Sequence, residues 1–270
     1  MQHLHSIKIF SFYYKPGRII TSDSIYFPIF SGKNGSFKAC PIPGDDTGDN
    51  ISSKNKYFSE LTGIYWVWKN THQEITGTCH YRRFLTVQPE PFSYQLKRLL
   101  YFPIGLFGKR FGLIYTKNTK LFVPRIISQE EIEGLLQKYD AILPQARKLK
   151  YSVETHFKRY HDINDLLLLE SIINEKHPEF LEAFYEVLKG KELYANNMFI
   201  LKDEHFQEFM TWWFDVLFEF ERRVDLSKYT GYQQRIFGFI GERLLNVWFR
   251  KKKLNCIELQ IIYFKHFKFE

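Results

Sequence analysis

The sequence predicts an α/β protein in which helices flank a mostly parallel β-sheet. Short apolar or alternating runs, typical of strands, alternate with segments of helical periodicity through residue 85 and again from residue 128 onward. The length of 270 residues fits one large α/β domain or one domain with a helical annex. We therefore treat 1–270 as a single domain whose C-terminal portion, 203–270, is largely helical.

The first elements follow from local patterns. Residues 7–14 are aromatic and partly alternating, and 26–30 form a second strand candidate. Residues 41–55 are rich in Pro, Gly, Asp and Asn and predict a loop. Apolar residues recur at helical spacing over 57–70, and Asn55 is suited to cap that helix. The segment 74–85 reads as a buried strand that ends in a charged tip.

Beyond residue 127, the expected elements alternate again. Ser128 and Glu131 have the spacing of a capping box, which begins a helix. The remaining expectations are strands over 140–143, 192–201 and 257–264, and helices over 153–160, 162–175, 178–188, 203–224 and 231–250.

The tip of the strand at 74–85 is the first candidate site. It reads His80, Tyr81, Arg82, Arg83, and side-chain alternation along a continuing strand would send His80 and Arg82 to one side and Tyr81 and Arg83 to the other. The end of a strand in an open α/β sheet is where a ligand normally binds. A guanidinium donates two parallel hydrogen bonds to a phosphate or a carboxylate, so these arginines predict an anion site. The alternative is that both arginines form ion pairs with acidic neighbours.

An acidic loop is the second candidate site. Asp45, Asp46, Asp49 and Asn50 lie within six residues. Their oxygens could bind a substrate or a divalent metal, although their spacing does not match an EF-hand. The alternative is a cluster of side chains that shape a turn and cap the next helix.

Two further positions carry candidate acid–base groups. His156 lies near His161 and two aspartates, where it is either part of a general-base pair or a surface hydrogen-bonding group. On the helix over 231–250, Arg235, Glu242 and Asn246 share one face. Glu242 can therefore serve as a base, or it can form a structural salt bridge.

Residues 88–127 form a basic insert with many aromatic residues, prolines and glycines. Three interpretations stay open. The insert can lie on an anionic membrane surface, pack on the core as an ordinary excursion, or stack on nucleic acid.

Composition narrows the function classes. The net charge of +8 favours anionic partners such as nucleotides, nucleic acid or acidic lipids. The three cysteines are widely spaced and fit a reducing compartment. The first fifteen residues do not match a signal peptide, and no apolar run of eighteen residues occurs, so we expect a cytoplasmic protein, with peripheral membrane contact as an option.

Several blocks in order resemble the DUF4422 group of bacterial glycosyltransferases, which act in capsular, exopolysaccharide and O-antigen synthesis. The resemblance spans roughly residues 7–262, and the insert 88–127 departs from it. The matching blocks are Asp45-Asp-Thr-Gly-Asp-Asn-Ile-Ser, Glu60-Leu-Thr-Gly-Ile-Tyr-Trp-Val-Trp-Lys-Asn70, His80-Tyr-Arg-Arg83, Tyr139-Asp-Ala-Ile-Leu-Pro144, Asn196-Asn-Met-Phe-Ile200 and Arg235-Ile-Phe-Gly-Phe-Ile-Gly-Glu-Arg-Leu.

The resemblance implies a GT-A-like fold and transfer of a sugar, expected to be galactose in pyranose or furanose form, from a UDP-sugar donor. The acceptor would be a growing glycan, lipid-linked or oligosaccharide, and nucleic acid is not an expected partner. We expect inversion by a single displacement, with Glu242 as the first candidate base and Asp46 as the second. The expected donor contacts are His80, Tyr81, Arg82, Arg83, Asp45, Asp49, Asn50, Trp66 and Arg235, and the expected acceptor contacts are Asn196, Asn197 and His156.

Two arginines can neutralise a departing diphosphate without a metal, because they place fixed positive charge where negative charge develops. We therefore expect metal-independent transfer. The competing expectation is a Mg²⁺ or Mn²⁺ site built from the loop Asp45–Asp49. The rival class is a non-catalytic basic protein that binds nucleic acid or anionic membrane.

Overall fold

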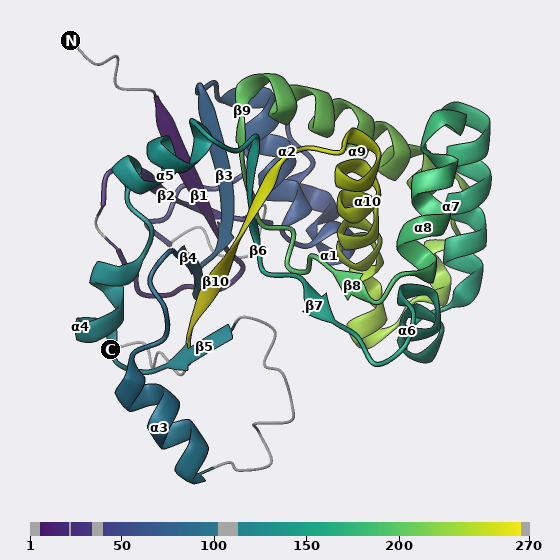
Figure 1. Cartoon of the computed structure of the whole chain (residues 1–270). Coiled ribbons are helices and arrows are strands. Elements are labelled where there is room, and N and C mark those ends of the chain that lie inside the picture. The colour runs from purple at the N-terminus through teal and green to yellow at the C-terminus, as the bar shows by residue number, and fades with distance from the viewer. Residues whose placement is uncertain (1–5, 22, 34–39, 102–112, 266–270) are drawn as a thin grey trace.

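A computed structural model describes residues 6–21, 23–33, 40–101 and 113–265, and an eight-stranded sheet forms its centre (Figure 1). Six strands run in one direction, and β4 and β9 run in the other. The prediction of an α/β fold with a central sheet is thereby confirmed. Successive neighbours across the sheet are β2 (Tyr26–Phe30), β1 (Ile7–Tyr13), β3 (Ile75–His80), β9 (Phe199–Lys202), β6 (Ala141–Pro144) and β10 (Cys256–Phe264), and β10 also pairs with β4 (Arg83–Thr86) and β5 (Leu113–Thr116).

The sheet separates two hydrophobic cores, because successive side chains of a strand point to opposite faces. In β9, Phe199 and Leu201 belong to the larger core, and Ile200 belongs to the smaller one. The larger core is packed by α1 (Asn55–Phe58), α2 (Leu61–Asn70), α6 (Val153–Tyr160), α7 (Ile163–Lys176), α8 (Leu181–Lys189), α9 (Asp203–Arg223) and α10 (Ile236–Lys252). The smaller core is packed by α4 (Thr119–Phe122) and α5 (Gln129–Leu136), and α3 (Phe92–Tyr101) lies at the lower left in Figure 1.

The helix expected over 57–70 and the strand expected over 192–201 are each divided into two elements. The helix expected over 57–70 is two helices, α1 and α2, because Ser59 adopts a positive φ of 54° between them. The Asn55 side chain donates to the Ser59 carbonyl, so it caps the end of α1 instead of the start of a longer helix. The strand expected over 192–201 is also two strands, β8 (Glu192–Leu193) and β9, and β8 pairs with β7 (Arg147–Lys148) in a separate sheet. Between them, Asn196 and Asn197 have positive φ, a conformation that asparagine tolerates better than most residues.

The helix expected over 231–250 begins later than predicted. Residues Gly231–Arg235 form a short 3₁₀ helix, and α10 starts at Ile236. Arg235 therefore precedes the α-helix that carries Glu242 and Asn246, and its guanidinium donates to Ser59 and lies near Glu60. The capping box at Ser128 and Glu131 is confirmed: the Ser128 hydroxyl accepts from the Glu131 N–H, and the Glu131 carboxylate accepts from the Ser128 N–H.

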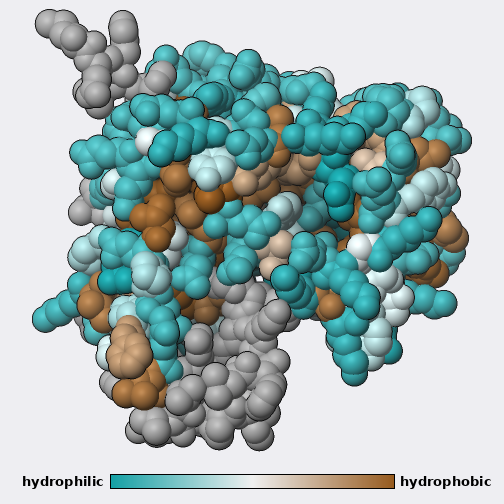
Figure 2. Space-filling view, in the orientation of Figure 1, coloured by the Kyte–Doolittle hydropathy of each residue, from teal (hydrophilic) through white to brown (hydrophobic). Residues whose placement is uncertain are grey.

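The described part of the insert 88–127 packs partly as an ordinary excursion. Its strand β5 joins the sheet beside β10, and Phe122 is fully buried in the smaller core. Phe92 and Leu96 of α3 are 77% and 44% exposed, and Figure 2 shows hydrophobic surface over this helix. Residues 102–112 lie outside the described part of the chain. None of the described helices is long and apolar enough to cross a membrane.

Candidate functional site

The carboxyl ends of β1, β3, β5, β6 and β10 meet at one edge of the sheet, where two cavities adjoin. A cavity of about 350 Å³, here called the cationic cavity, is lined by Arg82, Arg83, Leu113, Tyr115, Gln145, Arg147, Ala195, Asn196, Ile261, Tyr263 and Lys265. A cavity of about 290 Å³, here called the aromatic cavity, is lined by Phe12, Tyr13, Tyr14, Ser31, Asn55, Lys56, Ser59, Glu60, His80 and Arg235. This edge is where α/β sheets bind ligands.

A tight turn between β3 and β4 positions the charged tip. His80 pairs with Arg83 across the turn, so the chain reverses at Tyr81 and Arg82. The expected alternation over 80–83 is therefore wrong. His80 lines the aromatic cavity, whereas Arg82 and Arg83 both line the cationic cavity. The turn brings the two guanidinium groups together and separates them from His80.

The cationic cavity concentrates positive charge. Among the described residues that line it, four are cationic and none is acidic. The Arg82 guanidinium lies 4.9 Å from the Tyr81 ring centre and 5.4 Å from that of Tyr263, and Arg83 lies 5.2 Å from the latter. Within the described ranges, neither arginine has a carboxylate partner, and the buried Arg82 Nε has no hydrogen-bond partner. The alternative of structural ion pairs thus finds no support, and the arrangement suits an anion.

The aromatic cavity combines rings with hydrogen-bonding groups. Tyr14 is 50% exposed and Tyr13 is buried, and both rings contact Tyr81. Glu60 accepts a bond of 2.9 Å from the Asn197 amide and lies 3.4 Å from an Arg235 nitrogen. Because both partners fix the Glu60 carboxylate, it is held in one orientation while it faces the cavity.

His80 is kept neutral by its surroundings. Burial, with the positive charges of Arg83, Arg82 and Arg235, lowers the pKa of His80 well below its ordinary value. Its buried Nδ1 has no hydrogen-bond partner among the described residues. In a neutral imidazole one ring nitrogen donates a hydrogen bond and the other accepts one, so His80 adds no charge to the site.

Asn196 and Asn197 join the two cavities. The Asn196 N–H donates to Glu242 Oε1 at 2.8 Å, and the Asn197 amide reaches Glu60 as described. The other Glu242 oxygen lies 3.2 Å from Nη1 of Arg243, a residue that is only 2% exposed. Glu242 therefore lies directly behind the wall of the cationic cavity, and its carboxylate fixes the backbone of that wall.

The acidic loop is satisfied internally. Asp45 is fully buried, and its carboxylate accepts bonds from the Gly32 and Lys33 N–H groups and from the Ser52 hydroxyl. Asp49 accepts from the Tyr65 hydroxyl at 3.0 Å. These bonds tie the loop to the segment at Gly32 and Lys33 and to α2, no side chain of the described loop caps the helix that follows, and the donor set that remains does not fit a divalent metal.

The other expected contacts lie apart from the two cavities. Asp46 is exposed and lines neither, and the described part of the chain contains no cluster of three His, Cys, Asp or Glu residues able to hold a metal. The Asn50 amide donates to the Gly48 carbonyl within the loop. The Trp66 indole donates to Thr47, and His156 packs on α6 beside Tyr160. These residues stay predictions as ligand contacts, with no support from their placement.

The sequence reasoning missed several residues that line the cavities. Gln145 follows β6, and Lys265 follows β10, so each stands at the same sheet edge as His80. Their position after strand candidates was a usable signal. Arg147 and Tyr115 were harder to find, because only the pairing of β7 with β8 and of β5 with β10 brings them to this edge.

Comparisons with known proteins identify a family model and a solved structure that the chain resembles. A family model described as a domain of unknown function (DUF4422) matches residues 8–253. Among solved structures, the chain is similar to one described as the WbbM bifunctional glycosyltransferase in its apo form, with a TM-score of 0.83 and 28% sequence identity. That similarity covers 97% of this chain and 46% of the other, so this chain spans less than half of its length. No curated protein matches.

Proposed function

The chain belongs to the DUF4422 family, and from this premise we propose that it is a glycosyltransferase. The similarity to a bifunctional glycosyltransferase supports this class. As the finer proposal, it moves galactose, in pyranose or furanose form, from a UDP-sugar donor to a growing surface polysaccharide. A GT-A-like arrangement, in which the donor binds at the carboxyl ends of the first strands, belongs to the same proposal.

The observation that carries the proposal is the cationic cavity. A nucleotide sugar presents a diphosphate, and its negative charge grows as the sugar leaves. Arg82 and Arg83 lie at the β3–β4 turn without carboxylate partners in the described ranges, and Lys265 lines the same cavity. Fixed positive charges at such a position stabilise the leaving group. They do so without help from a metal, for which the acidic loop offers no suitable donor set.

The aromatic cavity supplies a place for the nucleoside. The exposed ring of Tyr14 can stack on a base, and the side-chain oxygen of Asn55, whose NH₂ group already donates to Ser59 and Thr62, can accept a hydrogen bond from the base edge. Glu60, already fixed by two partners, can accept hydrogen bonds from ribose hydroxyls. Because His80 lines this cavity and Arg82 lines the next, a nucleotide seated here extends its diphosphate across the turn into the cationic cavity.

The reaction would be a single displacement with inversion. An acceptor hydroxyl attacks the anomeric carbon, the bond from that carbon to the diphosphate oxygen breaks, and a carboxylate takes the hydroxyl proton. Glu242 is the proposed base, because Asn196, the residue that it holds, lines the cationic cavity. The acceptor, lipid-linked or oligosaccharide, would approach from the Asn196 side. The exposed face of α3 is the proposed place for peripheral contact with an anionic membrane.

Donor binding gives the first test. UDP should raise the melting temperature more than UMP or GDP does, and Arg82→Gln with Arg83→Gln should abolish that shift. Lys251→Gln removes one exposed cation on α10 and serves as the control. A protein of the rival class would instead bind oligonucleotides with a steep salt dependence.

Turnover gives the second test. Incubation with a panel of nucleotide sugars, with and without EDTA, should release UDP from one donor at an unchanged rate. Release that stops in EDTA would contradict metal-independent transfer. No release from any donor, together with no UDP shift, would contradict the proposed function.

A further inference from the structure

The cationic cavity holds more positive charge than a donor diphosphate neutralises. A nucleotide sugar has two doubly esterified phosphates and therefore about two negative charges, which rise to about three when the sugar leaves. Arg82 and Arg83 match the two charges of the bound donor. Lys265 lines the same cavity and is surplus to that balance even before Arg147 is counted. The surplus indicates that a second anionic group enters the cavity together with the diphosphate.

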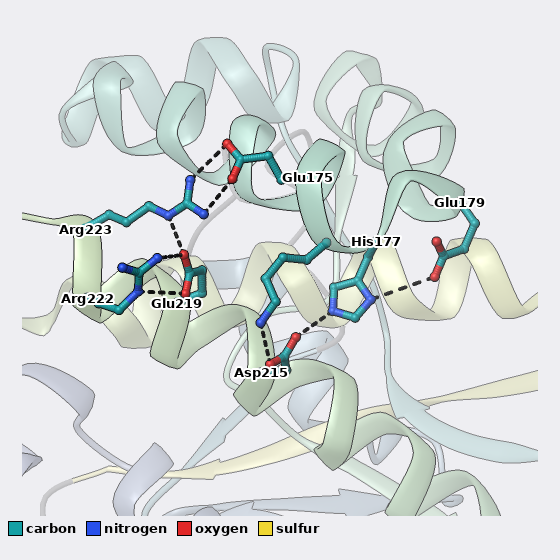
Figure 3. A network of polar contacts seen from close by, with 8 residues as sticks. Glu175, His177, Glu179, Asp215, Glu219, Arg222 and Arg223 are labelled. Atoms are coloured by element: carbon teal, nitrogen blue, oxygen red, sulfur yellow. Dashed lines mark hydrogen bonds and ion pairs between the residues drawn. The ribbon is translucent and has the colours of Figure 1, made fainter.

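Cations on the helical side of the molecule are instead balanced by carboxylates. On α9, Arg223 donates to Glu175 and Glu219, and Arg222 donates to Glu219 (Figure 3). Two guanidinium groups and two carboxylates thus cancel there. None of the described residues that line the cationic cavity is acidic, so the cavity wall itself offers no such balance.

The cations of the cavity divide between two aromatic rings. Arg83 on β4 pairs with Tyr263 on β10, and Tyr263 pairs with Tyr115 on β5. These three side chains therefore lie in a row on one face of the sheet. The guanidinium groups of Arg82 and Arg83 lie 5.4 and 5.2 Å from the Tyr263 ring centre. The Lys265 ammonium lies 4.3 Å from the ring centre of Tyr115, and the two ring centres are 5.1 Å apart. The cavity thus has two neighbouring cationic positions.

The position over Tyr115 is fixed by strand pairing. The Lys265 N–H donates to the Thr116 carbonyl at 2.8 Å, so the residue continues the pairing of β10 with β5 while its side chain stays exposed. Lys265 follows the last residue of the family match, 253, and Tyr115 belongs to the insert that departs from the family pattern. Arg82, by contrast, belongs to a matching block. The position over Tyr263 suits a donor that the family shares, and the position over Tyr115 suits another part of the substrate.

We propose that Lys265 and Tyr115 form a second anion subsite, which holds an anionic group of the acceptor while Arg82 and Arg83 hold the donor diphosphate. The inference rests on the proposed function and names the acceptor class, a glycan with a carboxylate or a phosphate near the attacking hydroxyl. The cation–π contact with Tyr115 holds the ammonium at the cavity wall, where it can donate hydrogen bonds to such a group. An acidic sugar and the phosphate of a lipid carrier share this chemistry.

The first experiment titrates inorganic phosphate into the whole chain saturated with UDP, and calorimetry measures both affinities. The UDP-saturated wild type should still bind phosphate. Lys265→Gln should weaken phosphate binding about threefold to tenfold and change UDP affinity less than about twofold, whereas Lys265→Arg should retain phosphate binding. Lys117→Gln is the matched control and should bind phosphate as wild type does, because Lys117 is an exposed lysine just after β5 that does not line the cavity.

Competition between the two anions decides between one subsite and two. If phosphate displaces UDP, or if Lys265→Gln binds phosphate as wild type does, the inference is overturned while the proposed function stands. If UDP does not bind the wild type, the proposed function fails instead. In that case, phosphate binding to the free protein that Lys265→Gln loses and the double variant of Arg82 and Arg83 keeps would still support the second subsite.

Displacement of the bound phosphate then identifies the source of the anionic group. Methyl galacturonoside presents a sugar carboxylate, methyl galactoside is its neutral counterpart, and geranyl phosphate presents the phosphate of an isoprenoid. Displacement by either anion, but not by the galactoside, supports the inference and assigns the source. Displacement by neither anion would make the phosphate an adventitious ion only and overturn the inference. Tighter, Lys265-dependent binding of UDP-galacturonate than of UDP-galactose would place the anion on the donor and would also overturn it.

Discussion

Replacing Glu242 by Gln tests two roles of this carboxylate at once. One oxygen holds the Asn196 N–H, and the other faces the guanidinium of Arg243, which is 2% exposed. Glutamine keeps an oxygen for Asn196 but removes the countercharge of a buried cation. Such a loss costs about 3–5 kcal/mol when nothing else compensates. Arg243 also donates to the Phe239 carbonyl at 2.9 Å, so we expect a smaller loss, about 1–3 kcal/mol.

For a chain of this size, that loss corresponds to a fall of the melting temperature by roughly 2–12 °C. If Glu242 is also the base, kcat should fall by about 10²–10⁴-fold at a temperature where the variant is fully folded. Donor binding, measured by titration with UDP, should stay near that of wild type. Asn246→Ala is the matched control. Asn246 lies on the same helix face, its side-chain amide makes two hydrogen bonds to the Tyr194 backbone, and it carries no charge.

The two variants distinguish proton transfer by Glu242 from a purely structural role of the 194–197 segment. Asn246→Ala should lower stability and disturb the 194–197 segment with only a modest effect on kcat. If Glu242→Gln keeps most of its turnover while folded, Glu242 only positions Asn196, and the proposed base is refuted. If both variants lose turnover equally, the effect comes from the segment and not from proton transfer.

Three further predictions concern residues near the site. Burial, with Arg83 and Arg82, lowers the pKa of His80, so below about pH 6.5 the unfolded chain binds a proton that the folded chain does not. As the pH falls through this range, the free energy of unfolding should therefore decrease by at most about 1.4 kcal/mol per pH unit for this group. Urea titrations at several pH values should show a flatter pH dependence of stability for His80→Gln than for wild type. Asp45→Asn should lower stability by about 1–3 kcal/mol in thermal melts, whereas EDTA should leave the melting of the wild type unchanged. Gly32 has a φ of 74°, and a Cβ there would lie 2.3 Å from the Asn55 side chain, so Gly32→Ala should cost at least about 1 kcal/mol and weaken UDP binding, which calorimetry can measure.

Local patterns predicted the elements that depend on local physics. The strand at 26–30, the capping box at Ser128 and the long helix from Asp203 follow from alternation, capping chemistry and helical periodicity. The family resemblance is likewise confirmed by the match over residues 8–253. The cluster of cations at the end of β3 was visible in the sequence because strand ends and charge can be read without knowing the fold.

What the sequence did not predict depends on pairing between distant segments. The turn after β3 is formed by Tyr81 and Arg82, and neither is a Gly, Pro or Asn of the kind that marks a tight turn in a sequence. The reversal of the chain there therefore had no local sequence signal. The antiparallel partner of β4 is β10, from the other end of the chain, and that pairing fixes the turn. Asn196 and Asn197 did offer a signal, since two asparagines tolerate positive φ, but the apolar run after them favoured one continuous strand.

The spatial arrangement explains why blocks so far apart in the sequence resemble one family. Glu60, His80, Asn197 and Arg235 come from four of those blocks, and hydrogen bonds or shared cavity walls join them at one edge of the sheet. Structural roles alone would not require this convergence, because the two hydrophobic cores lie on the faces of the sheet and not at its edge. The insert 88–127, which departs from the family pattern, supplies Leu113 and Tyr115 to the cationic cavity, and none of its described residues lines the aromatic cavity. If the family shares one donor chemistry and its members differ in acceptor, the aromatic cavity should hold the shared part of the substrate, and the wall at Tyr115 should contact the part that varies.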